Sequence, residues 1–470
     1  MLTGAAAFEG LKLGDRRRER RWRQIAAALE ENPELSLPKA VGSDSAAEAA
    51  YRLLGNRAFR ASTIVDHLSD VAWRNAAGAK VVLAIHDTTQ FSFTGSSRDG
   101  LSEFSSQRQG FYAHTALLVA AEGVPRAYGV VGCDPYTVRS KKWYRPAGND
   151  EEIELGIGSE RWTSLALAVG ERKPRGVELV HVMDREGDCF EMLAELDAAG
   201  ESFVVRAAHD RAIEESEGRL AALLASKPVI ATRDVWIGER RSSKDVPPKS
   251  RAKQTVVRSR SARLEVRIGE VNLTAPRDAR VTDRSPLRVY VVDVVESEPP
   301  EGATPVHWRL LTNRPISDAS DALATVDIYR RRWMIEEFFK ALKTGCEFER
   351  RQLESLTSLV SLLVMLLPVA TGLLNLRSLS RETPTAPWSA VVNEVQLAII
   401  KMKAPQRLGT RPTARSVMMA IAQMGGHLKQ NGEPGGLTLG RGWAELLSLE
   451  EGWRAAMAAM LKGNSGEFEM

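Results

Sequence analysis

Residues Tyr329 to Lys343 read YRRRWMIEEFFKALK, and their spacing guides the interpretation of the whole chain. At about 100° per residue of an α-helix, Arg332, Glu336 and Lys343 all fall within roughly 60° of Tyr329. An adjoining stripe is apolar and consists of Ile328, Ile335, Phe339 and Leu342. The pattern predicts one helix that packs this apolar face into a core and holds a carboxylate rigidly at the edge of a cleft.

Within this stretch, Glu336 rather than Glu337 is the candidate for chemistry. Glu337 falls off the polar stripe and is interpreted as a solvated partner of a lysine or an arginine. An ordinary amphipathic helix with a mixed-charge surface would show the same spacing. The rest of the chain must therefore decide between the two interpretations.

Composition indicates a soluble globular protein with room for two to four structural units. The chain has 470 residues, of which 43% are hydrophobic and 26% charged. The formal net charge is only +4, but basic residues cluster at Arg16 to Arg23, Arg139 to Arg145 and Arg240 to Arg267. Such clusters suit a polyanion such as DNA, although each block alone is also compatible with a solvated face or loop.

Cysteine and histidine usage argues against several other classes. Cys133, Cys189 and Cys346 are dispersed and form no CxxC pair, and the histidines show no HExxH spacing. This usage favours a reducing cytoplasm over a disulfide framework or a zinc site. No export signal is evident at the N-terminus. The apolar run from Leu359 to Leu376 is interrupted by Pro368 and is predicted to be a buried core helix, so no membrane is expected as a partner.

The first 70 residues are predicted to be a helical DNA-binding domain. Helices are expected through the arginine block, through SAAEAAYRLLGN and through ASTIVDHLSDVAWRNA. The arginines at the start of the first helix are suited to contacts with DNA phosphates, and they are Arg16, Arg17 and Arg18.

From residue 81 the pattern changes to that of strands. Lys80 to His86 is an apolar run that ends in Asp87, and Val177 to Met183 is another that ends in Asp184. Between and after them, the order strand, hairpin, helix, strand, helix, strand predicts a mixed α/β sheet. If the two strands are neighbours, the two carboxylates adjoin, because functional groups gather at strand ends in such sheets.

The domain organisation follows from where this alternation stops. Residues 71–375 are predicted to form the catalytic domain, interrupted at about 208–320 by an inserted β subdomain with a mobile basic loop at Asp245 to Lys253. Residues 376–470 are predicted to be helical, with apolar stripes suited to packing or to pairing with another subunit.

Two strand-end aspartates and one helix-borne glutamate would form an all-oxygen site. Such a site selects hard cations such as Mg²⁺ or Mn²⁺ over zinc. Two metals held by Asp87, Asp184 and Glu336 can activate a water or a 3′-hydroxyl and stabilise the leaving oxygen of a phosphodiester. The nearby Arg332 and Lys343 would hold phosphates, which indicates phosphoryl transfer on nucleic acid.

Each acid also has a simpler interpretation. Asp87 and Asp184 are equally compatible with turn or helix caps at strand ends. In the motif DREGD, Asp188 or Glu186 is an alternative to Asp184 as the working acid.

The spacing Y-x2-R-x3-E-x6-K, without a gap, resembles the YREK signature of the DDE transposases of bacterial insertion sequences, in particular the IS-four family. The surrounding motifs are similar as well: DTT at Asp87, DREGD at Asp184, FVVR at Phe203 and HWRLLTN at His307. The resemblance extends to LGDRRRERR and AYRLLGN near the N-terminus and to MAIAQMGG and SLEEGW near the C-terminus.

This resemblance implies a ribonuclease H-like fold in which Asp87, Asp184 and Glu336 bind the catalytic Mg²⁺ ions, for which Mn²⁺ can substitute. It implies DNA contacts by further residues, namely Tyr329, Arg332, Lys343, Arg206 and Trp308. Trp308 would stack on a flipped-out base, although a strand tryptophan packed in a core is the simpler expectation. The implied partners are transposon inverted-repeat ends, target DNA and a second subunit in a synaptic complex.

The predicted function is therefore cut-and-paste transposition by nicking, hairpin formation and strand transfer, in the bacterial cytoplasm at the nucleoid. A catalytically silent DNA-binding regulator is the alternative from another class, and a ribonuclease H-like nuclease that does not join strands is a third hypothesis. The intact set of acids argues against the regulator. The basic N-terminal part and the long helical C-terminal part argue against simple hydrolysis.

Overall fold

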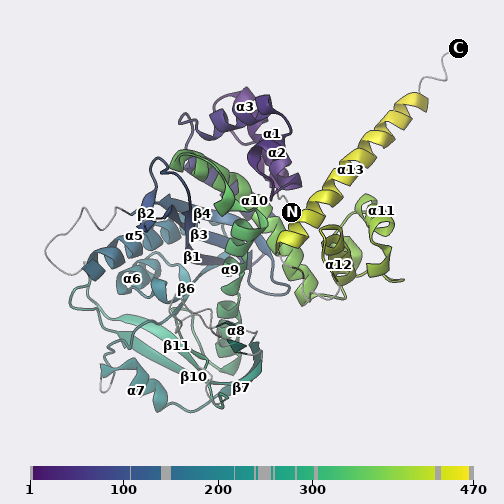
Figure 1. The fold of residues 1–470 in the computed structure, drawn as a ribbon. Helices are drawn as coiled ribbons and strands as arrows, with labels where there is room; N and C mark the ends of the chain where they lie inside the picture. The colour runs from purple at the N-terminus through teal and green to yellow at the C-terminus, as the bar shows by residue number, and fades with distance from the viewer. Residues whose placement is uncertain are drawn as a thin grey trace. The chain divides into compact units, whose positions relative to one another are not determined.

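The structure is a computed structural model that describes residues 4–105, 107–138, 150–215, 218–237, 240–241, 256–257, 260–280, 283–300, 305–428, 434 and 436–464 (Figure 1). The chain divides into two compact units. The first comprises Met1–Glu154, Ala168–Glu178 and Trp333–Met470, and the second comprises Leu155–Leu167 and Leu179–Arg332. The basic block Arg139 to Arg145 and the loop Asp245 to Lys253 lie outside the described residues.

The first unit begins with helices, as the sequence predicts. They are α1 (Arg16–Glu31), α2 (Leu37–Val41), α3 (Asp44–Leu54) and α4 (Ala61–Asn75). Trp22 of α1 is fully buried and makes edge-on ring contacts with Phe8 and Phe59, at centroid distances of 5.8 and 5.7 Å. These contacts fix α1 by its apolar face and leave its arginines on the other side.

Four antiparallel strands follow in the first unit: β1 (Val81–Phe93), β2 (Ser102–Ser105), β3 (Arg108–Ala120) and β4 (Ala127–Tyr136). The predicted hairpin of β3 and β4 is confirmed. The predicted end of the first strand is wrong, because β1 continues to Phe93 and Asp87 lies in its middle, opposite Thr115. The residues after Asp87 are threonine, glutamine, phenylalanine and serine, and β3 offers a full ladder of partners, so the strand continues through the acid.

The first unit ends in helices: α9 (Trp333–Lys340), α10 (Leu356–Glu382), α11 (Glu394–Lys403), α12 (Ala414–Met424) and α13 (Gly436–Asn464). The segment Leu356–Ser378 of α10 is long and apolar enough to cross a membrane by length and composition, yet 83% of its apolar window is buried within the protein. The prediction of a buried core helix is therefore confirmed. Helices α11, α12 and α13 share a second core around Ile400, Ile421 and Leu446 (Figure 1).

The second unit contains a mixed sheet with the middle of helix α5 (Asp150–Glu171) and with helices α6 (Phe190–Ala198), α7 (Leu220–Ala225) and α8 (Ala319–Arg330). Its strands are β5 (Glu178–Met183), β6 (Ser202–Arg206), β7 (Ala231–Ile237), β10 (Arg260–Leu273), β11 (Leu287–Glu296) and β12 (His307–Thr312), with the short β8 (Arg240–Arg241) and β9 (Val256–Val257) pairing separately. The sheet order is β5-β6-β12-β11-β10-β7; β5 and β6 are parallel and the other pairs are antiparallel.

The strands of the predicted insertion continue this sheet. β12 pairs with β6 through Leu310 and Arg206, and β10 and β11 run side by side beyond it (Figure 1). Phe190 and Leu193 of α6 pack with Phe203 of β6 and Val291 of β11 in one core. The mixed α/β architecture, with helices at both ends of the chain, confirms the predicted fold class and is consistent with a ribonuclease H-like fold.

The stretch from Tyr329 to Lys343 is not one helix, contrary to the prediction. Helix α8 ends at Arg330, the amides of Arg331 and Arg332 bond to carbonyls three residues back at 3.1 and 3.0 Å, and α9 begins at Trp333. A π-helix, Ala341–Gly345, then carries Lys343. Bonds three residues back tighten and end a helix, and a π-turn widens it, so a wheel of 100° per residue does not hold across the stretch.

Candidate active site

In the first unit, Asp87 and Lys343 share one electrostatic environment. Asp87 is half-buried on β1, and its Oδ1 accepts the amide N–H of Thr88 at 2.8 Å. The Lys343 ammonium lies 5.5 Å from the ring centroid of Phe91, which belongs to the same strand as Asp87. Burial lowers the pKa of Lys343, and the charges of Glu349 and Asp87 oppose that shift. The π-helix thus brings the last residue of the YREK spacing to the strand that carries the first acid.

Glu336 is presented by the first turn of α9. It is half-buried, beside Ile335, which is fully buried. The four predicted core residues, Ile328, Ile335, Phe339 and Leu342, are all buried, so the predicted apolar face is confirmed. A carboxylate in the first turn stabilises a helix, because it lies near the positive end of the helix dipole.

The neighbouring Glu337 forms an ion pair with Arg377 of α10. The prediction of a basic partner is confirmed, but not the prediction that the pair is solvated, because the two side chains are only 17% and 15% exposed. This contact ties the first turn of α9 to the buried helix α10. Glu336 is therefore carried by a turn that is fixed from both of its faces.

In the second unit, Asp184 directly follows β5 and caps a 3₁₀ turn, Arg185–Gly187. Its Oδ1 accepts the amide N–H of Glu186 at 2.8 Å, so the cap interpretation is also realised. A Cβ on Gly187 would lie 2.6 Å from the Cβ of Met183, which explains why this tight turn needs glycine. Glu186 is exposed, and the pKa of its carboxyl is raised by partial desolvation and by the charge of Asp184.

Asp188, the alternative acid, is engaged in a structural ion pair. Its side chain has no exposed surface and accepts hydrogen bonds from Arg211 Nε at 2.7 Å and from the amides of Ala208 and His209 at 2.7 and 3.2 Å. A carboxylate that already satisfies these buried donors is poorly placed to bind a metal or a substrate. Asp184 is therefore a better candidate than Asp188. Sequence reasoning did not find the Asp188–Arg211 pair.

Tyr329 joins several of the predicted DNA contacts in the second unit. It is buried, its ring meets that of Trp308 edge-on at 5.5 Å, and its hydroxyl is hydrogen-bonded to Arg206. Burial raises the pKa of the Tyr329 hydroxyl; Arg332 and Arg206 oppose this rise, and the charge of Asp184 adds to it. Arg206 also donates to the carbonyl oxygen of His307 at 2.8 Å. Trp308 is half-buried on β12, neither enclosed in a core nor fully exposed.

The predicted phosphate-binding arginines lie at the start of α1. Asp15 caps this helix by accepting the amides of Arg17 and Arg18 at 2.6 and 3.3 Å. Arg16 and Arg17 are exposed, and Arg18 is half-buried. Because the cap occupies these amides, contacts with phosphate would depend on the arginine side chains, of which Arg16 and Arg17 are exposed.

The metal-binding prediction rests on the donor chemistry of the acids. Among the residues that the structure describes, no three His, Cys, Asp or Glu side chains are grouped so that they could hold a metal ion. Asp87 and Glu336 belong to the first unit and Asp184 to the second. Carboxylate oxygens are the ligands that hard divalent cations prefer.

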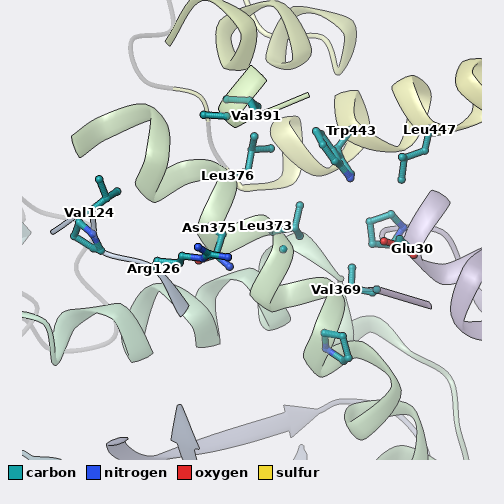
Figure 2. Close-up of a pocket in the computed structure, with 16 residues that line it drawn as sticks. Glu30, Val124, Arg126, Val369, Leu373, Asn375, Leu376, Val391, Trp443 and Leu447 are labelled. Carbon is teal, nitrogen blue, oxygen red and sulfur yellow. The ribbon is translucent and has the colours of Figure 1, made fainter. Parts of the chain in front are cut away.

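A separate cavity of about 660 Å³ lies within the first unit (Figure 2). Six of its sixteen lining residues come from α10, and the others include Glu30 of α1, Pro33 just after α1 and Trp443 of α13. Burial raises the pKa of Glu30, whose carboxylate accepts the amide N–H of Ala5 at 2.7 Å. None of the predicted site residues lines this cavity.

Acidic residues beside basic ones, on an α/β sheet preceded by a basic helical segment, are compatible with a protein that processes DNA. Two family models match the chain: "Transposase DNA-binding" over residues 5–59 and "Transposase DDE domain" over residues 191–370. The chain thus carries the DNA-binding and DDE domains of a DNA transposase. The first match contains Arg16 to Arg18 and the second contains Glu336, whereas Asp87 and Asp184 precede the second match.

Proposed function

We propose that the protein is a metal-dependent DDE transposase that cuts and joins DNA at the inverted-repeat ends of its element by cut-and-paste. One observation carries the proposal: the match to the transposase DDE domain, over residues 191–370, contains the glutamate and the three other residues of the YREK spacing. The geometry adds that Lys343 lies 5.5 Å from the ring centroid of Phe91, on the strand that carries Asp87, and that Tyr329 contacts Trp308 edge-on and is hydrogen-bonded to Arg206. Sites that cleave phosphodiesters need metal-binding acids together with groups that hold phosphates.

In this proposal Asp87, Asp184 and Glu336 hold Mg²⁺, for which Mn²⁺ substitutes. The bound ions supply activation of the attacking water or 3′-hydroxyl and stabilisation of the leaving oxygen. Lys343 and Arg332 position the phosphates, and Arg206 orients the Tyr329 hydroxyl that donates to one of them. Trp308 offers a ring on which a flipped-out base can stack during hairpin formation and strand transfer.

The proposed partners are double-stranded DNA at the element ends, target DNA and a second subunit in a synaptic complex. Helix α13 supports the homodimer, because Trp453, Met457 and Met460 are 38%, 47% and 67% exposed and recur every three to four residues on one face. We expect the protein to act in the bacterial cytoplasm, on nucleoid DNA.

Cleavage should depend on a divalent metal. We expect Mg²⁺ or Mn²⁺ to support nicked and hairpinned products on DNA that carries the inverted repeats flanking the gene, and a chelator to abolish them. A gel assay of end-labelled substrate measures this, with a duplex of scrambled repeats as the control. Tight, specific binding without any cleavage in either metal would instead favour the catalytically silent regulator. Cut ends that are never joined would favour a nuclease.

The arginines of α1 should determine how tightly the ends are bound. Replacing Arg16, Arg17 and Arg18 together by alanine is expected to weaken binding and to reduce the slope of log K against log salt by about 0.9 for each phosphate that is no longer neutralised. Titrations at several salt concentrations measure the slope. Arg52→Ala is the control, since that side chain is 72% exposed and paired with Glu48 on α3. An unchanged slope in the triple variant would place the phosphates elsewhere.

A further inference from the structure

The segment that follows the π-helix is bonded to the DNA-binding helices through a single buried arginine. Arg351 is 4% exposed, and its guanidinium donates to the carbonyl oxygens of Pro33 and Leu35 and, at 2.8 Å, to that of Cys346. Pro33 and Leu35 lie in the turn between α1 and α2, inside the region that matches the transposase DNA-binding family. One side chain thus satisfies carbonyls from two parts of the chain that lie more than 300 residues apart in sequence.

The contact at Cys346 is the C-terminal cap of the π-helix. Cys346 closes the run that begins with α9, so its carbonyl lies at the negative end of a helical segment, where a cation is favoured. The same run carries Glu336 in its first turn and Lys343 near its end. Arg351 therefore holds the end of the run that presents two of the proposed site residues.

The other side of this segment is fastened to the strand that carries Asp87. Phe348 is fully buried and meets the ring of Phe91 edge-on at 4.7 Å, and Glu349 accepts the amide N–H of Ser92 at 2.8 Å. Glu347 lies between Cys346, which Arg351 binds, and Phe348, and it adopts a left-handed backbone with φ of 49°, a conformation that costs free energy in a residue other than glycine. Such strain persists only where the surrounding contacts determine the backbone strongly.

A cavity beside the α1–α2 turn increases the share of its contacts that the hydrogen bonds of Arg351 provide. Pro33, whose carbonyl Arg351 binds, also lines the 660 Å³ cavity, together with Glu30 of α1 and Trp443 of α13 (Figure 2). Close packing is therefore incomplete on that side of the turn. Hydrogen bonds to a buried guanidinium have fixed directions, so they transmit a displacement that loose apolar contacts would absorb.

We infer that Arg351 is a positioning residue that couples DNA-end binding by the N-terminal helices to the geometry of the α9 and π-helix run. Binding of a DNA end to residues 5–59 restricts the motion of the α1–α2 turn. Through its hydrogen bonds to this turn and to Cys346, the Arg351 guanidinium then restricts the motion of the run that carries Glu336 and Lys343. The inference rests on the proposed function only in taking the N-terminal helices as the part that binds the ends.

The test is hydrogen exchange of the full chain, followed by mass spectrometry, with and without end DNA. In the native protein, end DNA should slow exchange in residues 16–31 and also in residues 341–350. In Arg351→Met the first effect should remain, whereas the slowing at 341–350 should fall at least fivefold. Single-turnover cleavage of pre-bound ends should slow about tenfold in this variant while the Kd for ends stays within about twofold.

Arg98→Met is the matched control. The Arg98 guanidinium donates to the carbonyl of Arg351 at 3.1 Å and lies 4.7 Å from the ring centroid of Phe93, but it does not bond to the α1–α2 turn. This variant weakens the packing of the same segment but keeps the hydrogen bonds from Arg351 to the α1–α2 turn. End DNA should therefore still slow hydrogen exchange in residues 341–350. If Arg351→Met does not fold, Arg351→Lys is measured in its place, because lysine keeps the charge but not the fork that binds three carbonyls.

Two results would overturn the inference. One is an undiminished response at 341–350 in the Arg351 variant, and the other is equal loss in the Arg351 and Arg98 variants, which would indicate general loosening of the segment. A native protein that shows no response at 341–350 would also refute the coupling. Failure of the proposed function is recognised separately, as the absence of metal-dependent cleavage by the native protein.

Discussion

Glu336→Gln should abolish cleavage while leaving end binding nearly unchanged. The substitution keeps the size of the side chain but removes the charge that would hold a divalent cation in the first turn of α9. A metal contributes several kcal/mol of transition-state stabilisation, and each 1.36 kcal/mol is a factor of ten in rate, so we expect a loss of about 1,000-fold or more. Single-turnover cleavage and a binding titration with the same duplex measure the two quantities.

The adjacent Glu337→Gln is the control for this experiment. It removes the same charge one residue along, but from a side chain that pairs with Arg377. We expect a lower unfolding temperature, because a mostly buried arginine loses its partner, and a cleavage rate close to that of the native protein well below that temperature. Equal loss of cleavage in both variants would contradict the assignment of Glu336.

Asp188→Ala should destabilise the protein strongly, whereas Asp184→Ala should inactivate it without doing so. Removing Asp188 leaves Arg211, whose side chain is 9% exposed, without its carboxylate and leaves the amides of Ala208 and His209 without their acceptor. Breaking a buried ion pair in this way costs about 3–5 kcal/mol. The midpoint of thermal unfolding should fall by roughly 10 °C.

Asp184 is half-buried and gives up only the cap of a short 3₁₀ turn, which costs about 1 kcal/mol. Its loss should nevertheless abolish cleavage and preserve end binding, and the same outcome is expected for Asp87→Ala. Calorimetry and the cleavage assay separate the two effects. Normal cleavage by Asp184→Ala would move attention to Glu186, which is exposed beside it.

Much of the fold can be predicted from the sequence, because patterns within a few residues specify many of its helices and strands. The apolar run of α10, the capped arginine helix α1 and the strand that ends at Asp184 all follow from periodicity and capping within a few residues. The apolar face that includes Ile335 was predicted correctly despite the break in the helix, because α9 itself is regular. Glu336, by contrast, was singled out by its alignment with Tyr329, Arg332 and Lys343, which the break before α9 and the π-helix after it do not preserve.

Other parts of the candidate site depended on contacts between distant segments. Pairing with β3 carries β1 through Asp87 to Phe93, and 3₁₀-type bonds at Arg331 and Arg332 end α8 before α9 starts. Only the tertiary structure distinguishes Asp188 from Asp184, because the difference lies in Arg211 and two amides, more than 15 residues away.

The sequence by itself determined the classes of element, the basic N-terminal helix and the acids worth testing, since local spacing decides which side chains share a face. Only the tertiary structure shows which charged side chains form structural ion pairs, such as Asp188 with Arg211 and Glu337 with Arg377. It also decided that Arg351 joins the α1–α2 turn to Cys346. The physical reason is that the hydrogen-bond acceptors of Arg351 are backbone carbonyls. Every residue has one, so the sequence does not show which carbonyls folding brings near the guanidinium.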